Sequence, residues 1–278
     1  MAFDKFDDEL TLFHNVQDMV ESKEVCLLSN SDFEEEIFEK MCSDINKNKW
    51  INNSGKDAPP PDFYSEELKL MFDIMMVNDN AFLNEKGKSI NLQKKAESEV
   101  YKELQNSGLL EKLPNLDRIY MNISGVEETN EHHQYSRYKK EFNRIIQKHI
   151  DSVPLYKNNH PNYKLGFLIY DETQPYVELE TCLYNIDYYK KIGRIPPVSK
   201  IHFPFLDKEF MSVFKNSGID FIFWYMNNKM IRCKNEETGK IEEVLKNGFP
   251  KVVIIDLQNF DNIELLEYSE VKMISTNL

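Results

Sequence analysis

Hydrophobic periodicity is the feature of this sequence that most limits its fold. In the first half of the chain, apolar residues recur at helical spacing in some segments and alternate with polar residues, as in strands, in others. Strand-like segments predominate in the second half. This order predicts a mixed α/β fold, in which helices pack on a mixed, partly antiparallel sheet.

The expected elements follow from the spacing of apolar residues and from helix-capping signals. The expected helices cover residues 3–22, 31–47, 92–104, 135–150 and 207–216. The expected strands cover residues 24–28, 68–77, 119–123, 165–170, 176–180, 219–226, 229–233 and 252–255. Asn227-Asn228 is expected to turn a hairpin, because Asn tolerates positive φ angles.

Residues 152–164 contain two prolines and several asparagines, and this composition predicts a loop or a hinge. A hinge there would divide the chain into a helix-rich, acidic lobe at 1–158 and a strand-rich lobe at 159–278. One continuous domain is the alternative. Either arrangement can bury a core, since 41% of the 278 residues are hydrophobic.

Several classes of protein are disfavoured by composition. The longest apolar run, Ile222 to Met226, is far shorter than the roughly 20 residues of a membrane helix, and the N-terminus lacks the pattern of a secretory signal. We therefore expect a cytoplasmic protein with no membrane partner. The 4 cysteines form no CxxC pair, and 9 glycines leave little room for a phosphate-cradling loop.

Charge is unevenly distributed along the chain. The net charge is −13, and residues 1–48 carry thirteen acidic against four basic side chains. By contrast, residues 132–164 carry seven basic against two acidic side chains. The helix expected at 135–150 could therefore follow a nucleic-acid backbone, through Arg137, Lys140, Arg144 and Lys148. A solvated face that balances the acidic segment is the alternative.

A pair of carboxylates carries the one motif that points to a chemistry. Pro61-Asp62 is followed, after ten residues, by Asp73-Ile74-Met75. This spacing resembles the signature of PD-(D/E)XK nucleases, and the resemblance covers residues 31–125. It implies that Asp62 and Asp73 hold Mg²⁺ and that the protein hydrolyses phosphodiester bonds in DNA or RNA. An ordinary turn followed by an edge strand would also contain Pro61-Asp62.

Two further residues enter through the same resemblance. Glu34 lies on the apolar side of the helix expected at 31–47, where the family often places an additional acid. Ser31 and Glu34 also match a capping box, which explains Glu34 without catalysis. The family's Lys position is occupied by Met75, so Lys69, on the same side of the strand as Asp73, is the candidate replacement.

A second acidic group surrounds Pro175 and comprises Asp171, Glu172, Glu178 and Glu180. These carboxylates could converge on a cation, or they could form the solvated tip of a hairpin.

Two functions are consistent with these patterns. The first is a Mg²⁺-dependent nuclease in a bacterial or phage defence setting. The second is a noncatalytic interaction protein, an inhibitor or complex subunit, whose acidic residues 1–48 dock on a basic partner.

Overall fold

The computed structural model describes two long segments, 134–179 and 198–226, and a number of shorter ones. The described residues are 5–22, 25–29, 31–42, 49–54, 61–79, 81–83, 89–91, 99, 102–103, 106–108, 134–179, 198–226, 232–234, 241–243, 250–259, 261 and 263–275.

A seven-stranded mixed sheet forms the centre of the molecule, in the order β1-β13-β10-β7-β4-β3-β2. Strands β4, β7 and β10 run parallel to one another, β13 is antiparallel to β10, and β3 is antiparallel to β4. The strands are β1 (Val25–Leu27), β2 (Ile51–Asn52), β3 (Phe63–Ser65), β4 (Leu70–Val77), β7 (Lys164–Asp171), β10 (Phe221–Tyr225) and β13 (Val252–Asp256).

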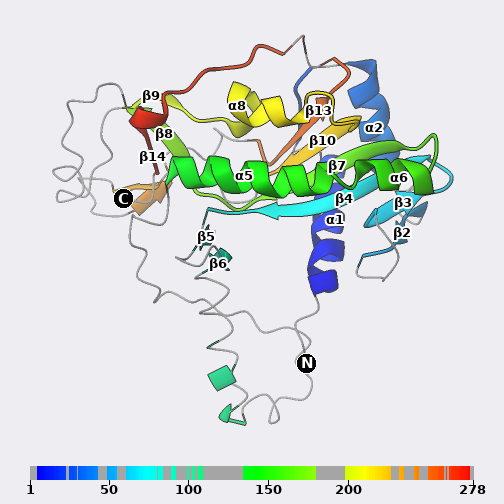
Figure 1. The fold of residues 1–278 in the computed structure, drawn as a ribbon, viewed down its shortest axis with the longest axis horizontal. Helices are drawn as coiled ribbons and strands as arrows, with labels where there is room; N and C mark the ends of the chain where they lie inside the picture. The colour runs from blue at the N-terminus through cyan, green and yellow to red at the C-terminus, as the bar shows by residue number, and fades with distance from the viewer. Residues whose placement is uncertain are drawn as a thin grey trace.

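Helices cover both faces of this sheet, so that the molecule has three layers (Figure 1). One face packs against α5 (Tyr135–Ile150), α6 (Val153–Asn159) and α8 (Lys208–Met211). The other face packs against α1 (Lys5–Glu21) and α2 (Asp32–Cys42). Among the described residues, no helix is both long and apolar enough to cross a membrane.

Smaller elements complete the described fold. Strand β8 (Tyr176–Leu179) pairs with β9 (Val198–Ile201) and with β14 (Met273–Ser275). Two further hairpins pair β5 (Ala81–Leu83) with β6 (Ser89–Asn91) and β11 (Arg232–Lys234) with β12 (Ile241–Glu243). The 3₁₀ turns are η2 (Pro204–Leu206), η3 (Ser212–Phe214) and η5 (Glu270–Lys272).

The mixed α/β architecture expected from the sequence is confirmed, as are the strand within 68–77 and the helix at 135–150. The seven-stranded sheet contains strands from both of the lobes expected at 1–158 and 159–278. The helix expected at 92–104 and the strand expected at 119–123 lie almost entirely outside the described residues. Gly108, which follows that segment, has a left-handed φ of 64°.

Three local predictions are wrong. The segment expected as a loop at 152–164 contains α6, and Pro154 fits there because the first turn of a helix needs no amide donor at that position. The helix expected at 207–216 is divided into α8 and η3. The hairpin around Asn227-Asn228 fails because β13 and β7 occupy both edges of β10, while β11 pairs with β12.

Gly166 in β7 provides a test of the packing at the centre of the sheet. The ring of Phe221, its neighbour on β10, lies where a Cβ atom on Gly166 would stand. We expect Gly166→Ala to lower the free energy of unfolding by roughly 2 kcal/mol or more, because overpacking a buried site forces strain. Urea denaturation would measure this loss. The double variant with Phe221→Leu should recover part of it, and a neutral Gly166→Ala would contradict the packing described.

Candidate active site

Asp73 is a buried carboxylate in the middle of β4. Side chains alternate along a strand, so Met71, Asp73 and Met75 share the face that packs under α5 and α6. Asp73 is only 2% exposed. Its Oδ2 atom lies 2.6 Å from Nδ1 of His149 and accepts a hydrogen bond of 2.9 Å from the Tyr156 hydroxyl. Both helices therefore send a polar side chain to this carboxylate.

Asp62 lies beside Asp73 because of the pairing of β3 with β4. Phe63 is opposite Phe72, and continuing this register by one residue places Asp62 opposite Asp73. The Asp62 Oδ2 atom accepts a hydrogen bond of 2.7 Å from the Ile74 amide. Burial, and then the charge of Asp73, raise the pKa of Asp62 to about 8. The pair therefore keeps one proton at neutral pH.

His149 is a partly exposed member of this group. It lies in the last turn of α5, and 23% of its side chain is exposed. With Nδ1 in contact with Asp73, Nε2 is the ring nitrogen that remains to exchange a proton with another group. Within the described part of the chain, Nε2 makes no hydrogen bond. A buried carboxylate that orients a partly exposed imidazole is an arrangement suited to general acid–base catalysis.

Lys69 and Glu34 do not join this group. Lys69 lies just before β4 in a turn with a left-handed φ of 55°, and its ammonium lies near the Tyr163 ring instead. Glu34 lies on α2, on the opposite face of the sheet. Its Oε1 atom accepts hydrogen bonds from the amides of Ser29 and Asp256, so Glu34 ties the start of α2 to β13. The Ser31 hydroxyl caps the Glu34 amide, as the capping box predicts.

The donor set of the pair determines which metal the site can take. Two adjacent carboxylates are hard oxygen ligands, and Mg²⁺ is commonly held by one or two of them together with water and substrate phosphates. The described residues contain no group of three or more His, Cys, Asp or Glu side chains arranged around a metal. Asp62 and Asp73 therefore fit a loosely held Mg²⁺, and they do not make a closed structural site.

The basic residues of α5 form an exposed row that ends beside this group. Lys140, Arg144 and Lys148 are four residues apart and all are exposed, whereas Arg137 is half-buried. Arg144 is held by Glu141, with an Nη2–Oε2 distance of 2.8 Å. Lys148 directly precedes His149. The row can therefore contact a polyanion that reaches the carboxylate pair.

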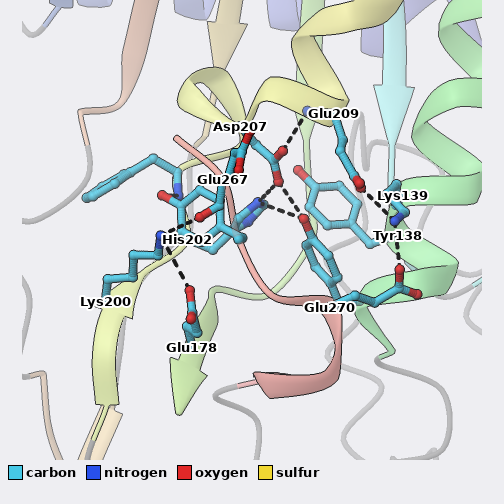
Figure 2. Close-up of polar contacts among 12 residues, drawn as sticks. Tyr138, Lys139, Glu178, Lys200, His202, Asp207, Glu209, Glu267 and Glu270 are labelled. Atoms are coloured by element: carbon cyan, nitrogen blue, oxygen red, sulfur yellow. Dashed lines mark hydrogen bonds and ion pairs between the residues drawn. The ribbon is translucent and has the colours of Figure 1, made fainter. Parts of the chain in front are cut away.

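A second polar cluster lies near the opposite end of α5 (Figure 2). Asp207 accepts hydrogen bonds from Tyr135 and from His202, whose Nε2 atom lies 2.7 Å away. Around this centre, ion pairs join Lys139 to Glu209 and Glu270, and Lys200 to Glu178. The side chain of His202 is only 1% exposed, so the Asp207–His202–Tyr135 centre is a buried fastening of α5 and α8 to the small sheet.

The acidic group around Pro175 is divided by the fold. Asp171 is buried, and it accepts hydrogen bonds from the Tyr138 hydroxyl, the Trp224 indole and the Thr173 hydroxyl. Glu178 faces Lys200 in the small sheet. Because β7 and β8 belong to different sheets, no hairpin forms here. Glu180 lies outside the described residues.

Sequence reasoning missed His149 and Tyr156. His149 follows Phe142 by seven residues and Ile145 by four, so the helical period already placed it on the buried side of α5. Tyr156 was hidden by the incorrect loop expected at 152–164. Neither residue has a local spacing to the carboxylates, because their contacts with Asp73 span 76 and 83 residues.

Comparisons with known proteins add no assignment. No family model, curated protein or solved structure matches the chain.

The raised pKa of Asp62 predicts how stability depends on pH when no divalent metal is present. The folded state binds a proton that the unfolded state releases between the ordinary value of 3.8 and about 8. The free energy of unfolding therefore falls as the pH rises through this window. We expect Asp62→Asn to remove this fall and to exceed the wild type by about 1 kcal/mol or more at pH 8.5. Urea denaturation in EDTA at pH 5 and pH 8.5 would measure it; equal pH dependence in both proteins would refute the shared proton.

The cluster at Asp207 gives a separate stability prediction. Asp207→Ala leaves His202 and Tyr135 buried without their acceptor, so we expect a loss of about 3–5 kcal/mol in the free energy of unfolding. The matched control is Glu267→Ala, which removes an exposed ion pair with Lys208 and should leave the free energy of unfolding nearly unchanged. Similar losses in both variants would show that the buried cluster does not stabilise the fold.

Proposed function

We propose that this protein hydrolyses phosphodiester bonds in nucleic acid, with Asp62, Asp73 and His149 at the reaction centre. One observation carries the proposal. Two carboxyl groups lie opposite each other on β4 and at the edge of β3, and one of them contacts a partly exposed imidazole. Burial and the neighbouring charge also raise the pKa of Asp62, and a carboxyl group with a raised pKa beside an imidazole is typical of acid–base sites. The proposed place of action is the cytoplasm, as expected from the sequence.

The role of each residue follows from its contacts. Asp73 holds the proton on Nδ1 of His149, and Tyr156 fixes the same carboxylate oxygen. Nε2 of His149 can then take the proton of a water molecule that attacks the phosphorus atom. Mg²⁺ held by Asp62 and Asp73 would replace the shared proton and offset negative charge on the phosphate. The hydrolysis yields a phosphomonoester and a free hydroxyl group.

The exposed row on α5 supplies the contacts to the rest of the substrate. Lys140, Arg144 and Lys148 can each neutralise a backbone phosphate, and Lys148 adjoins the imidazole that acts on the scissile bond. These contacts do not read bases, so the proposal assigns no sequence preference.

The decisive test compares the wild type with Asp73→Asn. Purified proteins are incubated with linear DNA, plasmid and single-stranded RNA in Mg²⁺, Mn²⁺ or EDTA. We expect cleavage by the wild type and a loss of at least about 100-fold in Asp73→Asn, because general acid–base groups contribute roughly 10²–10⁴ in rate. Asp171→Asn is the matched control, since Asp171 is equally buried and also binds a tyrosine hydroxyl.

Three outcomes would separate the possibilities. Cleavage that survives in Asp73→Asn would refute the assigned site. Loss of cleavage in Asp171→Asn as well would point to a general effect on folding, which thermal denaturation of both variants would detect. The absence of cleavage by the wild type under every condition would exclude the hydrolase and favour the second candidate.

The second candidate is a noncatalytic protein that docks on a basic partner. Its supporting observation is the surface of α1 and α2, where the exposed acidic residues are Asp18, Glu21, Asp32, Glu35 and Glu39. Complementary charge would accelerate such an encounter. Reversing the charge of Glu35 and Glu39 together should then abolish retention of the partner at low salt.

A further inference from the structure

Three aromatic rings and one lysine gather on the surface beside the candidate active site. The ring centroids of Tyr64 and His160 are 4.5 Å apart, and those of His160 and Tyr163 are 5.0 Å apart. The Lys69 ammonium lies 4.8 Å from the centre of the Tyr163 ring. Lys69 is exposed, and the three rings are partly buried. We call these four residues the aromatic platform.

Two tight turns hold the platform in place. Pro161 and Asn162 occupy the centre of the turn from His160 to Tyr163, and Asn162 has a φ of 68°, as the third position of a type II turn requires. The Tyr163 amide closes this turn with a hydrogen bond of 3.3 Å to the His160 carbonyl. The turn therefore brings the two rings to the same side.

Lys69 is fixed by a second turn at the start of β4. Its φ of 55° is left-handed, a conformation that is costly for a residue with a side chain. Hydrogen bonds hold it, from the Lys69 amide to the Ser65 carbonyl and from the Lys164 amide to the Lys69 carbonyl. The lysine is thus directed to the platform by backbone contacts on both sides.

The platform continues the row of residues that forms the candidate site. Tyr64 follows Asp62 by two residues, so both side chains lie on the same face of the edge hairpin. His160 follows Tyr156 by four residues, at the C-terminal end of α6. The Tyr156–Asp73 hydrogen bond and the Tyr64–His160 ring contact therefore both join α6 and its C-terminal residue to the β3–β4 hairpin.

We propose that the aromatic platform is a subsite that stacks an unpaired base of single-stranded nucleic acid, with Lys69 on an adjacent phosphate. Flat rings and a cation are the groups that single-strand-binding proteins use, because every base has a face that stacks. A duplex does not present such a face. The proposal rests on the hydrolase function proposed above, since it places the strand beside Asp62 and Asp73.

Neighbouring charges are compatible with this subsite. Burial lowers the pKa of His160, so its ring is neutral at pH 7 and stacks as an uncharged plane. Glu66 is the acidic group that acts on His160, and Glu67 is neutralised by Lys49 at 2.5 Å. The alternative is a purely structural cluster, in which the rings only cover the end of α6. That alternative predicts an effect on stability and none on binding.

The test measures binding of a fluorescent oligothymidylate to the full chain in EDTA, where metal-dependent cleavage is suppressed. We expect Tyr163→Leu to weaken binding at least about tenfold, because the loss of one stacked partner typically costs that much. Tyr163→Phe keeps the ring and should bind as the wild type does. Lys69→Met should reduce the slope of log affinity against log salt by about one phosphate contact. The same sequence as a duplex should bind more weakly.

Two results would overturn the subsite: equal binding by Tyr163→Leu and Tyr163→Phe, or equal binding of duplex and single strand. Hydrolysis of bis(p-nitrophenyl) phosphate, which has no base, separates this inference from the proposed function. The wild type should hydrolyse it, whereas Asp73→Asn should not. If no variant hydrolyses it but oligothymidylate binding depends on the Tyr163 ring, the hydrolase proposal fails and the base subsite stands.

Discussion

The buried carboxylate of Asp73 is the constraint on which this part of the structure depends. A charge in the middle of an otherwise apolar strand is costly unless donors reach it, and the neighbouring strands β3 and β7 use their backbone groups for the sheet. The donors therefore come from the layer above, as His149 from α5 and Tyr156 from α6. Asp62 adds a second carboxyl group, and the pair avoids a double charge by keeping a proton.

Several buried carboxylates of this protein are satisfied by tyrosine, but only some of these pairs are suited to chemistry. Tyr138 donates to Asp171 and Tyr176 donates to Asp79, and these side chains are all buried. The described clusters that pair Asp, His and Tyr are those at Asp73 and at Asp207. His202 in the latter has a 1% exposed side chain, against 23% for His149. Solvent exposure of the histidine therefore distinguishes the structural cluster at Asp207 from the candidate reaction centre at Asp73, although both contain the same kinds of polar group.

The carboxylate pair could be predicted from the sequence, but the residues that surround it could not. Strand alternation and helical spacing are local, so β4 and α5 could be predicted, and the register of one hairpin sufficed to bring Asp62 to Asp73. Lys69 is an even number of residues from Asp73, so a continuous strand would place both side chains on one face of the sheet. The left-handed turn at Lys69 instead directs its side chain to Tyr163. Glu34 does point inward, but to the opposite face of the sheet. His149 and Tyr156 needed the order of the strands, which no local pattern contains.

The net charge of −13 does not argue against a nucleic-acid substrate once the fold is considered. The exposed acidic residues of α1 and α2 lie on one face of the sheet, whereas Lys140, Arg144 and Lys148 lie on the helix that covers the other. The sheet and its two helix layers separate these groups by more than the Debye length of about 8 Å at physiological ionic strength. A polyanion near α5 therefore experiences the local positive row more strongly than the distant acidic face. For the nucleic-acid substrate proposed above, this polarity would favour approach along the row that leads to His149, because the acidic face repels a polyanion.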